Sequence, residues 1–125
     1  MDEYNVGTNK VVIREDRIVH ITVIGEQDDA IAQGFLDFHE KAHNIVGGKI
    51  RYLIDINQTG KASPMARRVY KQLGEMETTE RVALYGAHPL AKLVGNMVLS
   101  TFARNEAKFF NDEKSALQWI RRENT

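Results

Sequence analysis

Hydroxyl and cationic side chains gather between Thr59 and Lys71, where the polar chemistry of the chain is densest. Ser63 stands directly before Pro64, the order typical of a helix N-cap followed by the first helical residue. A helix N-terminus stabilises an added anion, and this one is surrounded by cationic side chains at Lys61, Arg67, Arg68 and Lys71. Ser63 is therefore either an N-cap beside a solvated basic face or a phosphorylation site.

Two further polar residues follow apolar segments. Asp55 comes at the end of the run Tyr52 to Ile54, and His88 follows the run that ends at Gly86. The carboxyl ends of parallel strands are where ligands and partners bind in α/β sheets, although either side chain could instead cap its own loop. The candidate partner-binding or ligand-binding residues are Asp55, Thr59, Ser63, Arg67, Arg68 and His88.

His39 and His43 lie four residues apart, a spacing that can place two imidazoles on one metal ion. No third ligand lies nearby except Glu40, which points to another side of the same helix, so we expect two histidines that pack over the edge of the core, and no metal. The sequence contains no nucleophile elbow, phosphate-binding loop, dinucleotide fingerprint or zinc helix. We therefore expect no catalytic residues and no cofactor.

The hydrophobic periodicity predicts the elements that position these residues. Alternating or continuous apolar runs favour strands at 11–14, 18–24, 52–56, 82–86 and 108–110, with a loop at 57–61. Helices are expected from Asp28 to the Gly47-Gly48 pair, from Ser63 to Met76, from His88 to about Asn105, and from Asp112 to Arg122. The order ββαβαβαβα predicts one α/β domain over residues 1–125, with a mostly parallel sheet and an antiparallel N-terminal edge.

The helix predicted at 88–105 has an apolar surface broader than one core stripe requires. Burial between the sheet and the C-terminal helix would explain this breadth. Alternatively, the surface is a homodimer interface or the wall of a cavity for an apolar ligand, with candidate residues Leu93, Met97 and Phe102.

Composition excludes several classes of protein. The chain has 125 residues and no cysteine, which removes disulfide frameworks and zinc-thiolate sites. Lys and Arg number 17 and so do Asp and Glu, a balance that disfavours generic nucleic-acid binding. No apolar run is long enough for a membrane span and the N-terminus is too acidic for a signal peptide, so we expect a cytoplasmic protein.

Four features, in order, resemble a known family. They are a hairpin that enters a helix near Asp28, the segment Leu53-Ile54-Asp55 with Ser63-Pro64-Met65-Ala66-Arg67 after it, the strand Val82 to Gly86 with Pro89-Leu90 and Gly95-Asn96, and the closing run Phe109 to Glu113 with Ala116-Leu117 and Trp119-Ile120. Their order and spacing are similar to the STAS/anti-anti-sigma superfamily, in its stage II sporulation protein AA-like branch. The resemblance also extends to the lipid-binding CRAL-TRIO fold.

The resemblance implies a STAS-like fold without catalysis, with a binding surface at the loops after the third and fourth strands. In the anti-sigma antagonists, a serine in a D-S-[SG]-G-type turn is phosphorylated to switch partner binding. Ser63 is the closest positional match, although the acidic residue before it and the glycine after it are absent. We expect a regulatory protein-binding module, and the alternative is a carrier or sensor of a small hydrophobic or lipid ligand.

Overall fold

The computed structural model describes residues 2–99 and 106–122 of the chain. Six strands and four helices alternate after an all-strand start. In chain order they are β1 (Asp2–Val6), β2 (Asn9–Ile13), β3 (Ile18–Gln27), α1 (Asp29–Val46), β4 (Ile50–Ala62), α2 (Pro64–Glu75), β5 (Thr79–Tyr85), α3 (Pro89–Leu99), β6 (Glu106–Phe110) and α4 (Glu113–Ile120).

The six strands form one sheet in the order β1-β2-β3-β4-β5-β6. β2 is antiparallel to both of its neighbours, β1 and β3. Strands β3 to β6 are parallel because a helix connects each strand to the next. The predicted α/β domain, with its mostly parallel sheet and antiparallel N-terminal edge, is confirmed. Within the described residues no helix combines the length and apolar character needed to cross a membrane.

One strand was missed by the prediction. The segment Asp2–Val6 forms β1 and extends the expected hairpin to a three-stranded antiparallel edge. Gly7 and Thr8 make the tight turn between β1 and β2, and Gly7 adopts a φ of 61°, which glycine reaches without strain. The segment carries few apolar residues because only the side chains at Tyr4 and Val6 face the core.

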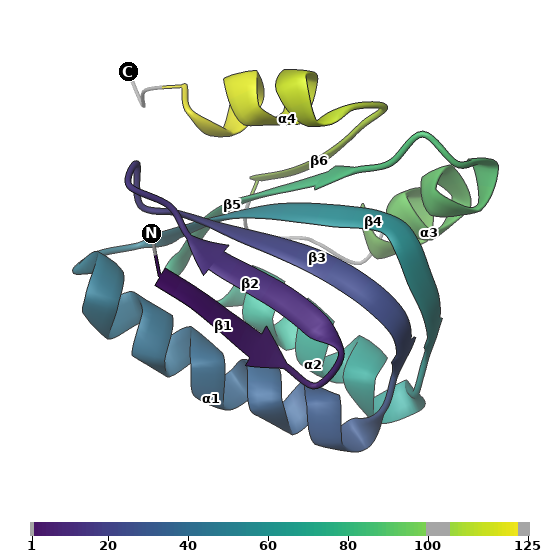
Figure 1. Ribbon diagram of the computed structural model, residues 1–125, viewed down its shortest axis with the longest axis horizontal. Coiled ribbons are helices and arrows are strands. Elements are labelled where there is room, and N and C mark those ends of the chain that lie inside the picture. Colours follow the sequence, from purple (N-terminus) through teal and green to yellow (C-terminus); the bar gives the residue numbers. More distant parts are fainter. Residues whose placement is uncertain (1, 100–105, 123–125) are drawn as a thin grey trace.

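The prediction of a loop at 57–61 is also wrong, because β4 continues through this segment to Ala62. Here β4 pairs with the end of β3, with Thr59 opposite Gly25 and Ala62 opposite Gln27. The two backbones come so close that a Cβ atom at Gly60 would lie 2.9 Å from the carbonyl carbon of Gly25. A two-stranded ribbon therefore extends past the ends of the other parallel strands and carries the chain to α2 (Figure 1).

The helix boundaries follow the predicted capping chemistry. The Asp28 carboxylate accepts a hydrogen bond from the Ile31 N–H at 2.8 Å and caps α1, which ends at Gly47 in the left-handed region. Ser63 caps α2 with Pro64 in the first turn, and Asp112 caps α4. These polar residues satisfy N–H groups that have no partner within the helix.

Helices cover the two sheet faces unequally. In Figure 1, α1 and α2 lie along one face, where the larger core includes Phe35, Phe38 and the strand residues opposite them. Ala91 of α3 belongs to this same core, whereas Ala116 and Ile120 of α4 pack on Leu53 and other residues of the second face. The predicted burial of α3 between the sheet and α4 is therefore wrong, because α3 and α4 cover opposite faces of the sheet.

Candidate functional site

The predicted site residues do not converge on one loop, because the segment after Asp55 belongs to β4. Ser63 lies eight positions after Asp55, which corresponds to about 26 Å along an extended strand. Asp55 and His88 therefore lie at the end of the parallel sheet, whereas Ser63 lies at the far end of the ribbon, where α2 begins. Thr59 lies between them, half-buried and paired with Gly25.

Asp55 lies within β4, opposite Tyr85 at the end of β5. One of its carboxylate oxygens accepts hydrogen bonds from the backbone N–H and the side-chain amide of Asn57, both at 2.9 Å. The amide oxygen of Asn57 accepts in turn from the Ala87 N–H at 2.8 Å, and His88 follows on the exposed surface. This chain of contacts joins β4 to the connection between β5 and α3, which matches the capping alternative for Asp55.

Ser63 joins the N-termini of two helices. Its hydroxyl accepts a hydrogen bond from the Ala66 N–H at 3.0 Å as the N-cap of α2, and donates one to the Asp29 carboxylate of α1 at 2.6 Å. The Ser63 N–H also bonds to the carbonyl of Gln27 at 2.9 Å. No local pattern in the sequence signals the Asp29 contact, because 34 residues separate the pair.

This arrangement changes the electrostatics around Ser63. The carboxylates of Asp28 and Asp29 already occupy the start of α1 beside it, where they complement the helix dipole. A phosphate on Ser63 would lose the donated hydrogen bond and meet a like charge at Asp29. The surroundings of Ser63 are therefore less receptive to an anion than the nearby cations alone indicate.

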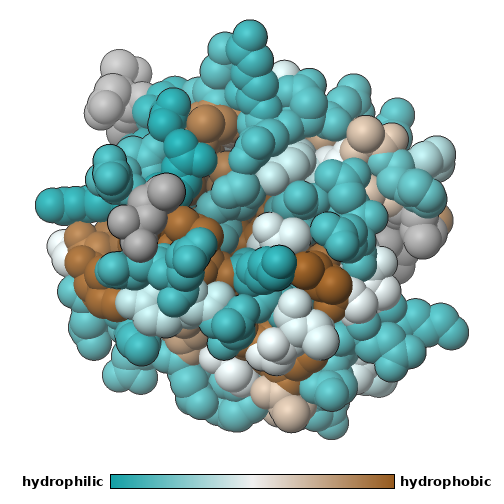
Figure 2. Space-filling view, in the orientation of Figure 1, coloured by the Kyte–Doolittle hydropathy of each residue, from teal (hydrophilic) through white to brown (hydrophobic). Residues whose placement is uncertain are grey.

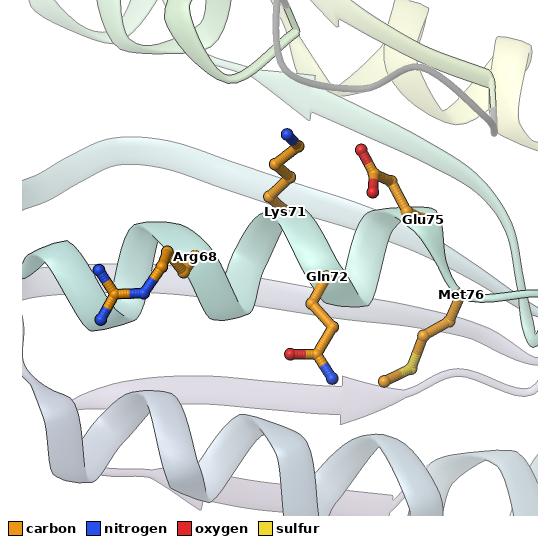
Figure 3. A pocket seen from close by; sticks show the side chains of 5 residues that line it. All are labelled: Arg68, Lys71, Gln72, Glu75 and Met76. Carbon is orange, nitrogen blue, oxygen red and sulfur yellow. The ribbon is translucent and has the colours of Figure 1, made fainter.

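The cations lie farther along α2, on its exposed surface. Arg67, Arg68 and Lys71 are exposed, and together they are called here the basic face of α2. Arg68 and Lys71 line an open groove of about 590 Å³ together with Gln72, Glu75 and Met76 (Figure 3). The only acidic side chain of α2, Glu75, is at its C-terminal end, so no carboxylate within this helix stands beside Arg67.

The arginines of the basic face differ from the other arginines that the structure describes. Neither the Arg67 nor the Arg68 side chain makes an ion pair or a hydrogen bond with the described part of the chain, whereas the Arg17 side chain donates to the Val46 carbonyl. The remaining described arginines each pair with a carboxylate: Arg14, Arg51, Arg81, Arg121 and Arg122. Two adjacent guanidinium groups at the surface thus have donors that no other described residue uses.

A second polar cluster lies on the sheet face that carries α4. His20 of β3 and the Tyr85 hydroxyl of β5 are 2.8 Å apart, and the same imidazole nitrogen is 3.6 Å from the Glu113 carboxylate. Tyr85 also bonds to Asp55. Sequence reasoning missed this cluster, because the strand register that brings residues 20 and 85 together is not visible in the spacing of the residues.

Burial controls the titration of this cluster. Burial lowers the pKa of His20 and Arg14 lowers it further, whereas the carboxylates of Glu113 and Asp55 oppose the shift. Burial also raises the pKa of Tyr85, and the same two carboxylates add to that effect. Both groups are therefore neutral at pH 7, which makes the cluster a hydrogen-bonded link between strands and α4 rather than an ion pair.

His39 and His43 are both engaged by the protein. One ring nitrogen of His39 lies 2.5 Å from the Tyr52 hydroxyl and the other lies 2.7 Å from the Thr78 hydroxyl. A ring nitrogen of His43 lies 2.8 Å from the Gly48 carbonyl oxygen. Across the described residues, no three His, Asp or Glu side chains form a group that could hold a metal ion.

The apolar candidates on α3 are described only in part. The side chain of Leu93 is exposed, at 58% of its maximum. The Met97 side chain and the whole of Phe102 lie outside the described residues. Ala91 and Gly95 lie on the inner side, where Gly95 leaves room for the ring of Phe109 of β6.

The order of strands, the parallel crossovers and the polar N-terminus of α2 define this chain as a single α/β domain of the STAS-like type. A family model described as SpoIIAA-like matches residues 18–121. The chain belongs to the SpoIIAA-like family, which confirms the resemblance of its motifs.

A solved structure supports the same fold. The chain is similar to an uncharacterized protein of the DUF3478 family with a SpoIIAA-like fold from Shewanella loihica PV-4, with a TM-score of 0.71 and 23% identity. The match covers 94% of this chain and 97% of that one. No curated protein matches the chain.

Proposed function

We propose that this domain is a non-catalytic regulatory module that binds an acidic segment of a partner protein on the basic face of α2. The observation that carries the proposal is the pair Arg67 and Arg68, which have no partner in the described part of the chain although other described arginines do. A guanidinium group offers five donors in a planar fork that matches a carboxylate. Two adjacent guanidinium groups without partners among the described residues are suited to bind the carboxylates of a short acidic segment.

The position of these arginines adds to the argument. Arg67 ends the first turn of α2, where the helix dipole disfavours cations, and Arg68 follows it directly. Neither side chain makes an ion pair or a hydrogen bond with the described residues that would offset this cost. Exposed charged residues that cost stability in the free domain without a polar partner are typical of a binding surface.

The charge pattern favours a protein partner over a nucleic acid. Acidic side chains flank the basic face, with Asp28 and Asp29 near its start and Glu75 at its end. A continuous phosphate backbone would approach these carboxylates as well as the cations, and the chain as a whole carries no net positive charge. A protein segment with a few carboxylates could contact Arg67 and Arg68 without this repulsion.

A site-specific crosslinking experiment tests the proposal. A photo-crosslinking amino acid would replace Gln72, in the groove beside the basic face, or Gln118, exposed on α4, in cells that express the chain natively. We expect a protein adduct at residue 72 and none of the same mass at residue 118. The adduct should weaken as salt is added, because salt screens exposed charges.

The matched control is a charge reversal elsewhere. Arg67→Glu with Arg68→Glu should abolish the adduct, whereas Arg121→Glu, on an arginine whose side chain is 50% exposed, should leave it intact. An adduct that survives the double reversal would refute the role of the basic face. A hydrophobic molecule that co-purifies with the intact domain in native mass spectrometry would instead support the ligand-carrier alternative.

A further inference from the structure

The backbone of β1 has an open edge, and the hydrogen-bond register shows which groups it presents. The Arg14 N–H bonds to the Ile18 carbonyl at 2.9 Å. Backbone groups alternate in direction along an antiparallel strand, so Val12 and Lys10 also bond toward β3. The β2 residues between them must therefore direct their N–H and C=O groups toward β1.

Those intervening β2 residues stand opposite Asp2, Tyr4 and Val6 of β1. The N–H and C=O groups of Glu3 and Asn5 consequently point away from the sheet, where the strand order of the described residues gives β1 no outer neighbour. No proline interrupts this edge, and its pairing with β2 has no bulge. The outward-pointing backbone N–H and C=O groups of Glu3 and Asn5 could therefore form hydrogen bonds with another strand.

Apolar surface accompanies the open edge. A groove of about 670 Å³ runs between β1 and α1 and is lined by both elements. In it the Tyr4 ring meets the Phe38 ring edge-on at 5.3 Å, and the Lys41 ammonium lies 4.7 Å from the centre of the Tyr4 ring. Hydrophobic residues, in brown, are visible between hydrophilic ones on the face of the molecule that Figure 1 also shows (Figure 2).

We propose that a second copy of this chain occupies this edge, with the two β1 strands antiparallel across a two-fold axis at Tyr4. In this register Glu3 stands opposite the partner's Asn5 and Asn5 opposite the partner's Glu3. Both are positions whose backbone groups point outward, so each pair exchanges two hydrogen bonds. The Tyr4 rings meet at the axis, and the two grooves join into one apolar layer.

Charge selects this register over its neighbours. A shift of two residues in one direction places Glu3 opposite the partner's Glu3, which is destabilising for like charges on adjacent strands. A shift in the other direction places Glu3 opposite the partner's Gly7, in the turn, and leaves a single outward pair at Asn5. The register centred on Tyr4 is therefore the one in which the edge is complementary to itself.

Substitutions of opposite charge at Asn5 test the register. Asn5→Glu would place like charges opposite each other twice across the axis, and Asn5→Lys would place opposite charges there. We expect the dimer dissociation constant from sedimentation velocity to rise at least about threefold for Asn5→Glu and to fall by a similar factor for Asn5→Lys. Shifts of the same sign, no shift, or a wild-type monomer at high micromolar concentration would overturn the proposal.

A second pair of variants tests the edge itself. Asn5→Pro removes an N–H that β2 does not use, so the monomer should fold while the dimer is lost. Asn5→Val keeps the N–H and serves as the matched control, with dimerisation retained. Circular dichroism confirms that each variant is folded. A dimer that persists in folded Asn5→Pro would place the interface elsewhere, for example on the exposed surface of α3 at Leu93.

Discussion

The Ser63 hydroxyl shows how one side chain can serve two helices at once. As an acceptor it caps α2 through the Ala66 N–H, and as a donor it reaches the Asp29 carboxylate at the start of α1. An N-cap needs only the acceptor, so the donated bond is an additional tie between neighbouring helices. A residue that replaces Ser63 must therefore satisfy two requirements.

Asparagine and aspartate at position 63 separate these requirements. Both can cap α2, but only the amide that Ser63→Asn introduces could donate to Asp29, whereas Ser63→Asp adds a repelling carboxylate. We expect the free energy of unfolding, measured in urea, to be about 1 kcal/mol lower for Ser63→Asp than for Ser63→Asn. High salt should reduce this difference. Equal stability would show that the site accepts an anion, and would favour Ser63 as a phosphorylation site.

His39 makes the stability of the domain depend on pH. Burial lowers its pKa, and the nearby His43 lowers it further, so the unfolded chain binds a proton more readily than the folded one. Stability is therefore fully present above the unfolded pKa of 6.5 and declines as the pH falls from there toward the lowered folded value. His20, whose pKa is also lowered, acts in the same direction.

Glutamine at position 39 tests this dependence. His39→Gln keeps hydrogen-bonding groups near Tyr52 and Thr78 but removes the titration, so the loss of unfolding free energy between pH 7 and pH 5 should become smaller. Urea unfolding across this range measures the slope. His43→Gln is the comparison: it keeps the buried His39 ring and removes only the lesser cause of its lowered pKa, so the slope should change less than in His39→Gln. A slope unchanged in His39→Gln would contradict the assignment.

At the scale of elements, α4 depends on arginines from the sheet beneath it. Arg51 of β4 donates to the carbonyl of Ile120 at 3.0 Å, and the buried Arg81 of β5 donates to the carbonyls of Ile120 and Arg122 at 3.4 and 2.5 Å. Arg81 also pairs with Glu106 at 3.4 Å. These donors satisfy the C-terminal carbonyls that a helix leaves without intrahelical partners.

Methionine at position 81 should loosen α4. Arg81→Met keeps the length of the buried chain but removes every donor. The Arg122 carbonyl then loses its partner and the Ile120 carbonyl keeps only Arg51, at a cost of about 1 to 3 kcal/mol. Hydrogen exchange should rise in α4 more than in α1. Arg121→Met removes the exposed pair with Asp16 and should cost less than about 1 kcal/mol. Equal costs for the two variants would refute the anchoring role of Arg81.

The elements differ in how far the sequence predicts them. The helices α1, α2 and α4 were predictable because each begins directly after an N-cap residue that the sequence shows: Asp28, Ser63 and Asp112. The strand β1 and the end of β4 were not, since both are exposed on part of their surface and lack a continuous apolar pattern. Backbone pairing with a neighbour, which leaves no local signal, places both in the sheet.

The site divides in the same way. Arg67 and Arg68 could be identified from the sequence because a helix of known start places them on its surface. Their lack of partners among the described residues could not, since it depends on where the carboxylates of the folded chain lie. The same holds for the contact of Ser63 with Asp29 and of His20 with Tyr85, which the packing of helices and the register of strands create.

Across the whole molecule, the equal numbers of basic and acidic side chains are divided unevenly between the two halves of the sequence. Residues 1–62 carry 7 basic and 10 acidic side chains, and residues 63–125 carry 10 basic and 7 acidic ones. The fold brings the two parts together at the parallel helices α1 and α2, whose N-termini adjoin through Ser63 and Asp29. Acidic side chains begin one helix, while Arg67, Arg68 and Lys71 follow along the other.

This division predicts that the basic face can be reversed without harm to the fold. In Arg67→Glu with Arg68→Glu no side-chain partner among the described residues is lost, and the first of the new carboxylates lies in the first turn of α2, where the dipole favours anions. The free energy of unfolding should remain within about 0.5 kcal/mol of the wild type or rise, as urea unfolding would measure. Arg51→Glu, which breaks the half-buried pair with Glu80 and opposes two carboxylates, should destabilise clearly. A large loss in the Arg67/Arg68 variant would show that these arginines stabilise the fold, and loss of binding in it would then reveal nothing about a docking surface.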